Sequence, residues 1–201
     1  MKRLFIALSF PSDVVMKFTE LQCGLRGARW VLPQNLHLTL SYTGEASNIL
    51  LEDLADVLRS LAVQAFCMQL RGVNNLTSKG RSNFVWVGVA EKSSLFSLQS
   101  KIKNRLQINR IPTDKRQFSP HVTLARLKNV RPEDTAGFIA FNNLFKTRSF
   151  RVQSFTLFEI FNEGGLYLFT LREVSTDLTC APKIGLPIVF KSFKGGGEIV
   201  T

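Results

Sequence analysis

The chain has 201 residues, of which 45% are hydrophobic and 20% charged, and 26 Lys and Arg against 15 Asp and Glu give a formal net charge of +11. The many apolar residues, with only 13 Gly and 7 Pro, exclude a disordered, collagen-like or coiled-coil protein and suffice for one sizeable core or two small lobes. This positive charge favours polyanionic ligands, of which nucleic acid is the commonest in a cell, with simple solubility as the alternative.

Strand-length and helix-length patterns alternate along the chain. The apolar and polar spacing predicts strands at 2–9, 35–41, 66–73, 84–90, 121–127, 150–161 and 166–174. Amphipathic spacing predicts helices at 12–23, 47–65 and 93–109. Gly44 is expected to close the second strand. The alternation would allow a parallel sheet, but the polar-alternating strands and the hairpins favour a mainly antiparallel α+β fold.

The compartment is expected to be the cytoplasm. The charged start and the following apolar residues imitate a signal peptide, but Pro11 and Asp13 cut the apolar run to about seven residues, and no small-residue cleavage site follows. No apolar run reaches the roughly 18 residues of a membrane-spanning helix. Three distant cysteines without Cys-x-x-Cys spacing fit a reducing compartment and argue against a disulfide framework or a zinc site: Cys23, Cys67 and Cys180.

The order of elements contains an internal repeat. The strand at 4–8, its helix and a strand with His37 are matched by the strand at 84–89, its helix and a strand with His121. If the halves are pseudo-symmetric copies, the two histidines take equivalent places and face one cleft across an approximate two-fold axis.

The two histidines are the only ones in the chain, and both begin the same pattern, His37-Leu-Thr39-Leu and His121-Val-Thr123-Leu. Coincidence explains the shared Thr poorly, because Thr accounts for only 13 of 201 residues. On a strand of period two, each His and Thr point to the same side. A single histidine on a strand is more often structural, but two of them can act as base and acid in an in-line displacement at phosphorus.

Three further groups suit the phosphoryl oxygens, where negative charge builds in the transition state. Thr39 and Thr123 offer hydroxyl donors, and Arg126, near the end of the second His strand, offers a guanidinium, although surface solvation would also explain it. Three aromatic residues lie close to the motifs in sequence and are candidates for stacking on a terminal base: Trp30, Tyr42 and Phe118.

From residue 2 to 174 the sequence resembles the two-histidine (2H) phosphoesterases, and among them the bacterial and archaeal RNA 2′,3′-cyclic phosphodiesterases, once called 2′-5′ RNA ligases. The resemblance rests on four segments: Arg3-Leu4-Phe5-Ile6-Ala7-Leu8, Asn35-Leu36-His37-Leu38-Thr39-Leu40 with Gly44-Glu45, Val85-Trp86-Val87-Gly88-Val89, and Phe118-Ser119-Pro120-His121-Val122-Thr123-Leu124-Ala125-Arg126. The chain departs from the family at Tyr42-Thr43, where relatives usually have Phe-Leu, and at 81–84.

The resemblance implies a bilobal, pseudo-two-fold α+β fold with two mainly antiparallel sheets, outer helices and a central cleft, formed by residues 1–174 as a single domain. Residues 175–201 match nothing familiar and are expected to form a loosely held tail. The implied reaction hydrolyses an RNA 2′,3′-cyclic phosphate end to a 2′-phosphate, without metal or cofactor, and could run in reverse as a 2′-5′ ligation.

Carried over by motif, His37 and His121 are catalytic, Thr39 and Thr123 bind phosphoryl oxygens, and Arg126 assists. We assign His121 as the base and His37 as the acid that protonates the departing 3′-oxygen, although the reverse assignment would use the same residues. The alternatives are a non-catalytic, basic RNA-binding module, or the same fold acting on small cyclic nucleotides or 2′-5′ oligonucleotides. The oligomeric state expected by default is a monomer.

Overall fold

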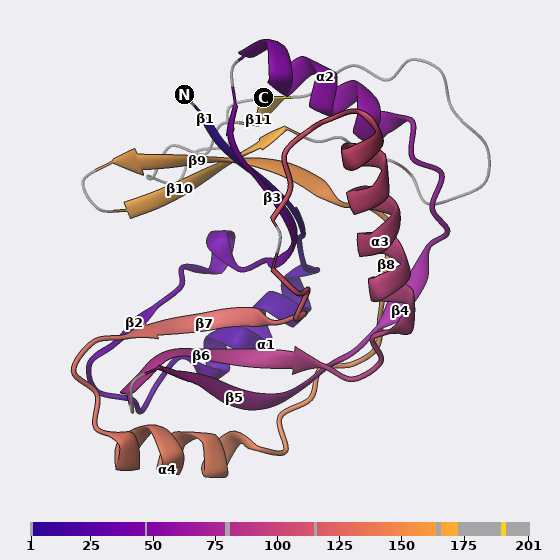
Figure 1. Ribbon diagram of the computed structural model, residues 1–201. Coiled ribbons are helices and arrows are strands. Elements are labelled where there is room, and N and C mark those ends of the chain that lie inside the picture. The colour runs from indigo at the N-terminus through magenta and orange to yellow at the C-terminus, as the bar shows by residue number, and fades with distance from the viewer. Residues whose placement is uncertain are drawn as a thin grey trace.

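The computed structural model describes residues 2–46, 48–78, 81–114, 116–163, 166–172 and 190–191 (Figure 1). Its helices are α1 (Ser12–Leu21), α2 (Asn48–Arg59), α3 (Ser93–Ile108), α4 (Pro132–Asn142) and the short 3-10 helix η1 (Pro33–Asn35). Its strands are β1 (Lys2–Leu8), β2 (Ala28–Trp30), β3 (Leu38–Ala46), β4 (Phe66–Met68), β5 (Leu70–Ser78), β6 (Arg81–Val89), β7 (Val122–Leu127), β8 (Phe150–Val152), β9 (Thr156–Glu163), β10 (Leu166–Arg172) and β11 (Phe190–Lys191). Apart from β11, the predicted tail at 175–201 lies outside the described residues.

The strands form a large sheet in the order β11-β10-β9-β1-β3-β7-β6-β5, with β2 beside β7, and a small sheet of β4 and β8. Every strand pair in the described parts of the chain is antiparallel. The predicted α+β class with antiparallel sheets is therefore confirmed, and the parallel alternative is wrong. Figure 1 shows β10, β9, β1 and β3 in the upper half of the molecule and β7, β6, β5 and β2 in the lower half.

The two halves repeat one another in strand register, including a β-bulge. In both halves the first strand of the repeat pairs with the His-motif strand, and the register skips the fourth residue of the motif, which is Leu40 or Leu124. The matched pairs are Ala7↔Thr39, Ile6↔Ser41 and Phe5↔Tyr42 in one half, and Trp86↔Thr123, Val85↔Ala125 and Phe84↔Arg126 in the other. The repeat inferred from the sequence pattern is thus present in the backbone pairing.

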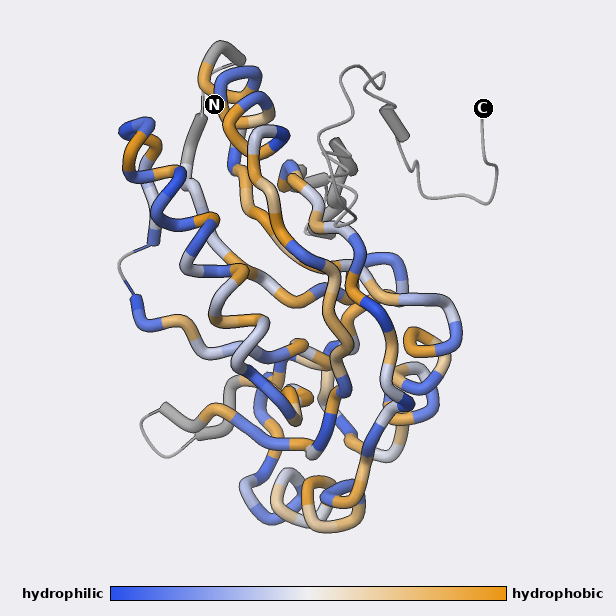
Figure 2. Tube along the Cα trace, turned by 90° about the vertical axis from the view of Figure 1, so that its right-hand side faces the viewer, coloured by the Kyte–Doolittle hydropathy of each residue, from blue (hydrophilic) through white to orange (hydrophobic). Residues whose placement is uncertain are grey.

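The helices cover the sheet with apolar faces at helical spacing. α3 packs against β3 and α2, while α4 packs against β5 and β6. Figure 2 shows hydrophobic segments along the strands in the middle of the molecule and polar segments alternating with them on the helices. The buried helical residues are Val14, Phe18 and Leu21 of α1, Leu51, Leu54, Ala55 and Leu58 of α2, Leu95, Leu98, Ile102 and Leu106 of α3, and Thr135 and Phe138 of α4. None of the described helices is both long and apolar enough to cross a membrane.

Several predicted elements differ from the observed ones. β3 begins after His37 and continues through Gly44, which has a positive φ of 77° and pairs with Leu4, so this glycine does not end the strand. The helix expected to reach residue 65 ends at Arg59. α4 is not predicted, because its apolar residues do not share one face: Phe138 is buried, whereas Phe141 is 89% exposed.

Candidate functional site

The two histidine motifs meet where β3 lies beside β7, and Leu38 pairs with Val122 at this junction. Both of these side chains are fully buried in the core. Because successive side chains of a strand alternate between its faces, the flanking residues point away from the core. These four residues, His37, Thr39, His121 and Thr123, define what we call the histidine face.

The junction also brings the two motifs together on the histidine face. β3 and β7 meet through the pair Leu38↔Val122, and in each motif the histidine comes just before this pair and the threonine just after it. Both imidazoles and both hydroxyls therefore flank one contact between the strands.

Each imidazole is held by the backbone two residues before it. Nδ1 of His37 lies 2.7 Å from the carbonyl oxygen of Asn35, and Nδ1 of His121 lies 2.7 Å from that of Ser119. A carbonyl oxygen only accepts hydrogen bonds, so Nδ1 carries the proton and donates in both cases. Nε2 is then the nitrogen that exchanges a proton, and it is the same atom in the two halves.

The two imidazoles differ in their surroundings. The His37 ring is half-buried, with its centroid 4.8 Å from that of Phe5 and 6.0 Å from that of Phe158. This burial lowers the pKa of His37 below its usual 6.5; the hydrogen bond to Asn35 opposes the effect, and the charge of nearby His121 adds to it. The His121 ring is exposed and meets Trp86 edge-on, with centroids 5.8 Å apart.

The β-bulge at Leu124 brings Arg126 onto the histidine face. By strict alternation, a residue five positions after His121 would point to the opposite side of the sheet. Because the register skips Leu124, the side chains after it point to the side opposite to the one that strict alternation predicts, and Arg126 pairs with Phe84. The Arg126 guanidinium lies 6.0 Å from the centre of the Phe84 ring. Phe84 and Trp86 alternate with buried residues on β6 and share its other face, and Trp86 contacts His121. Arg126, Thr123 and His121 are therefore on one side.

The three aromatic candidates have different positions. Tyr42 occupies the place in its half that Arg126 has in the other, and is 40% exposed, with its ring 5.7 Å from that of Phe5. Trp30 packs against Phe138 on the core side, and Phe118 packs edge-on against Phe96. The structure thus leaves Tyr42 as a candidate for base stacking and makes Trp30 and Phe118 packing residues.

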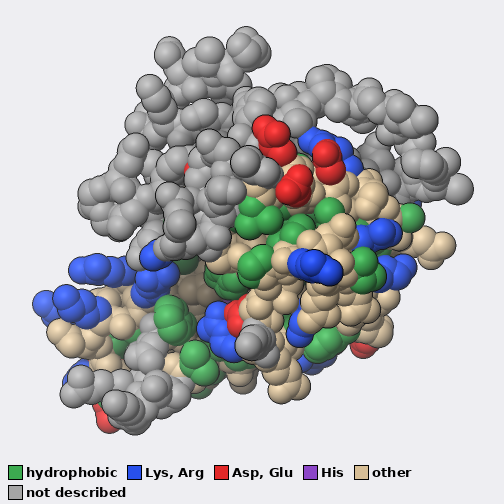
Figure 3. Space-filling view, turned by 45° about the horizontal axis from the view of Figure 1, so that its top comes forward, with side chains coloured by type: hydrophobic (Ala, Val, Ile, Leu, Met, Phe, Trp, Pro, Cys, Tyr) green, Lys and Arg blue, Asp and Glu red, His purple; other side chains and the backbone are tan. Residues whose placement is uncertain are grey.

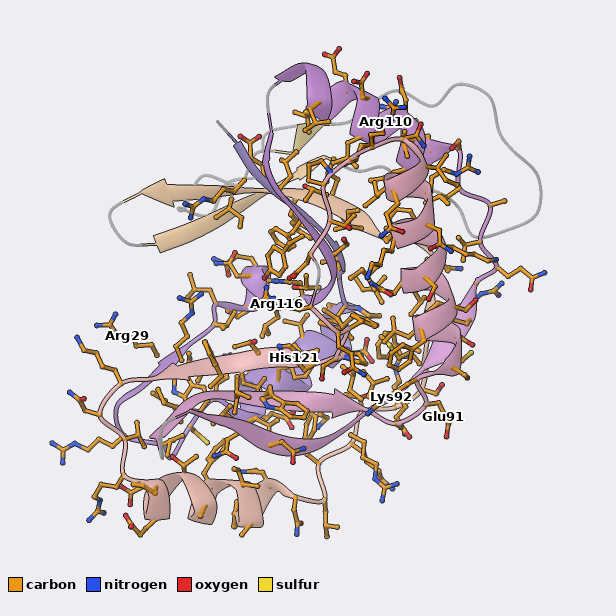
Figure 4. All side chains as sticks on the ribbon, in the orientation of Figure 1. Arg29, Glu91, Lys92, Arg110, Arg116 and His121 are labelled. Carbon is orange, nitrogen blue, oxygen red and sulfur yellow. The ribbon has the colours of Figure 1, made fainter. Side chains whose placement is uncertain are left out.

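The surroundings of the site are rich in cations. In the view of Figure 4, Arg116 lies above His121, between the two halves, and Arg29 lies toward the far end of β7. Arg116 forms an ion pair of 2.6 Å with Asp114, whose N–H donates to the carbonyl of Tyr42 at 3.1 Å. In Figure 3, hydrophobic and basic side chains border a recess on the face shown. The described residues hold no group of three or more His, Cys, Asp or Glu that could bind a metal ion.

Comparison with known proteins identifies the family of this chain. Residues 10–162 match the 2'-5' RNA ligase superfamily, and the chain belongs to this family. It is 30% identical over 134 residues to the RNA 2',3'-cyclic phosphodiesterase of Archaeoglobus fulgidus, an alignment that covers 65% of this chain and 76% of the relative. It is 33% identical over 144 residues to the protein of the same name from Thermus thermophilus, an alignment that covers 65% of this chain and 71% of that protein.

Solved structures of similar proteins have the same fold. The crystal structure of TT0787 of Thermus thermophilus superposes with a TM-score of 0.70 at 25% identity, covering 85% of this chain and 95% of that one. The apo form of LigT of Escherichia coli superposes with a TM-score of 0.70 at 23% identity, covering 86% of this chain and 95% of LigT. The likeness extends over most of the chain, and the LigT structure supports the fold alone.

Some residues around the site are not identified by the motifs. Phe5 and Phe158 come from strands far apart in sequence and meet beside His37, with centroids 5.0 Å apart. Arg29 is placed across from Arg126 by the pairing of β2 with β7. No local pattern in the sequence contains this information, because these neighbours depend on strand order and register.

Proposed function

We propose that this chain is an RNA 2′,3′-cyclic phosphodiesterase that hydrolyses a terminal 2′,3′-cyclic phosphate to a 2′-phosphate by two-histidine acid and base catalysis. The observation that carries the proposal is the Leu38↔Val122 junction, which sets two imidazoles, each with Nε2 available for proton exchange, on one face. The relatives named RNA 2',3'-cyclic phosphodiesterase support the substrate class.

In the proposed reaction, Nε2 of His121 takes a proton from water, and the water oxygen attacks phosphorus. The bond from phosphorus to the 3′-oxygen breaks, and this oxygen takes a proton from Nε2 of His37, which leaves a 2′-phosphate. The exposure of His121 favours it as the base, because this ring can be reached by water. His37 becomes charged once phosphate is bound, because a nearby negative charge favours the protonated imidazole.

The remaining groups are proposed to stabilise the charge that builds on the phosphoryl oxygens. The hydroxyls of Thr39 and Thr123 share the histidine face with the imidazoles and can donate to these oxygens, and Arg126 adds a positive charge on the same face. The two imidazoles account for both proton transfers, so the mechanism needs no metal ion. With the 5′-hydroxyl of another RNA in place of water, the same groups would form a 2′-5′ linkage.

The test is incubation of the purified chain, with excess chelator, with a short RNA ending in a 2′,3′-cyclic phosphate, followed by separation of the 2′- and 3′-phosphate products over a pH series. We expect turnover to the 2′-phosphate alone. Binding without turnover by folded protein at every pH would contradict the proposal and favour the RNA-binding module. A 3′-phosphate product would contradict the assignment of the leaving oxygen.

A further inference from the structure

Arg29 and Arg126 lie directly across from one another in the pairing of β2 with β7. Directly opposed residues of an antiparallel pair have β-carbons about 5 Å apart and project to the same side of the sheet. Arg126 is on the histidine face, so the side chain of Arg29 starts on that face as well. Both arginines are exposed.

The placement of Arg29 is fixed by its neighbours along the chain. Ala28 and Trp30, on either side of it, pack against the core, so Arg29 must point the other way. Beyond β2, the N–H of Val31 donates to the carbonyl of Leu124 at 2.8 Å, and Gln22 donates through Nε2 to the carbonyl of Val31 at 2.7 Å. This arginine therefore extends from a firmly held strand.

Within the part of the chain that the structure describes, no carboxylate pairs with Arg29. By contrast, Arg116, Arg131 and Arg148 are paired with Asp114, Asp134 and Asp13. A phosphate group suits the guanidinium of Arg29, because this group presents a fork of N–H donors.

The position of Arg29 relative to the histidines indicates which phosphate it takes. β7 starts just after His121, and Arg29 lies across from Arg126 near the other end of this strand, so Arg29 starts to one side of the reacting phosphate. When a 3′-terminal cyclic phosphate lies at the histidines, the rest of the RNA continues through the 5′-oxygen of the last nucleotide. We propose that Arg29 binds the phosphodiester on the 5′ side of the terminal nucleotide, leaving Arg126 to the reacting phosphate, which makes an RNA chain the preferred substrate over a nucleoside cyclic phosphate.

This inference rests on the proposed function, and its test uses substrates that differ by one phosphate. Turnover is compared for adenosine 2′,3′-cyclic phosphate, for the same compound with a 5′-phosphate, and for the ApA dinucleotide ending in a 2′,3′-cyclic phosphate. We expect Arg29→Gln to lower kcat/KM about tenfold, through KM, for the two substrates that carry the extra phosphate, and to leave the first unchanged. The matched control is Arg151→Gln, which removes an equal charge from an exposed position on β8.

Three results would overturn the inference. Arg29→Gln could keep its kcat/KM on the substrates with the extra phosphate, it could lose kcat/KM equally on adenosine 2′,3′-cyclic phosphate, or Arg151→Gln could show the same loss of kcat/KM. Calorimetric binding of adenosine 2′-phosphate and adenosine 2′,5′-bisphosphate separates this inference from the proposed function. If the wild-type chain turns over none of the substrates, the proposed function fails. The role of Arg29 is tested separately by the binding preference for the bisphosphate over the monophosphate, which Arg29→Gln should lose. Arg29→Lys should keep part of this preference. An intact preference in Arg29→Gln would overturn the inference.

Discussion

Leu38 and Val122 pair across the junction of β3 and β7 with both side chains fully buried, and their neighbours on either side are the two histidines and the two threonines of the site. The same contact thus joins the two halves of the sheet and sets the spacing of the imidazoles. We expect stability and activity to be coupled at this point, because a shift of either strand moves a histidine with it.

Leu38→Ala is expected to lower the free energy of unfolding by about 2–5 kcal/mol, as for a buried leucine that leaves a cavity. Its kcat should fall as well, because the strand carrying Thr39 loses its anchor. Urea unfolding measures the first effect and turnover under folded conditions the second. Leu76→Ala is the control: Leu76 is 55% exposed on β5, and its loss should change stability by no more than about 0.5 kcal/mol.

His37→Ala and His121→Ala are each expected to lower kcat by about 10²–10⁴-fold, the usual contribution of a general acid or base. Added imidazole should restore turnover more fully in His121→Ala, because the exposed position admits a small base from solvent and the half-buried position beside Phe5 does not. Rescue is measured as a function of imidazole concentration. Better rescue of His37→Ala would contradict the described difference in burial.

Thr39→Val and Thr123→Val keep the shape of the side chain and remove the hydroxyl. If these hydroxyls donate to phosphoryl oxygens in the transition state, each variant should lose about 10²–10³-fold in kcat. Thr43→Val is the matched control, because the Thr43 hydroxyl is buried and donates to the carbonyl of Leu4 at 3.1 Å. That variant should lose about 1 kcal/mol of stability and keep its turnover. Equal kinetic losses in all three would contradict a specific role for Thr39 and Thr123.

The buried position of His37 predicts a pH dependence of stability. In the unfolded chain this histidine titrates near pH 6.5, whereas in the folded chain its pKa is lower. Between these values the unfolded state binds more protons, so the free energy of unfolding falls as the pH falls below 6.5 and levels off below the folded pKa. His37→Gln should remove this part of the dependence. Urea unfolding of both proteins at several pH values measures it, and parallel curves would contradict the burial of the neutral ring.

The amino-acid sequence by itself determined the antiparallel α+β class, most of the elements and the duplicated His-x-Thr pattern, because these depend on local periodicity and on residue identity. It also selected Arg126, but alternation would have put this residue on the wrong side of the sheet. The tertiary structure decided that the bulge at Leu124 returns Arg126 to the histidine face, that Trp30 packs on the core, and that Arg29 lies opposite Arg126. Strand order, register and bulges come from packing between segments distant in the chain, and no local pattern encodes them.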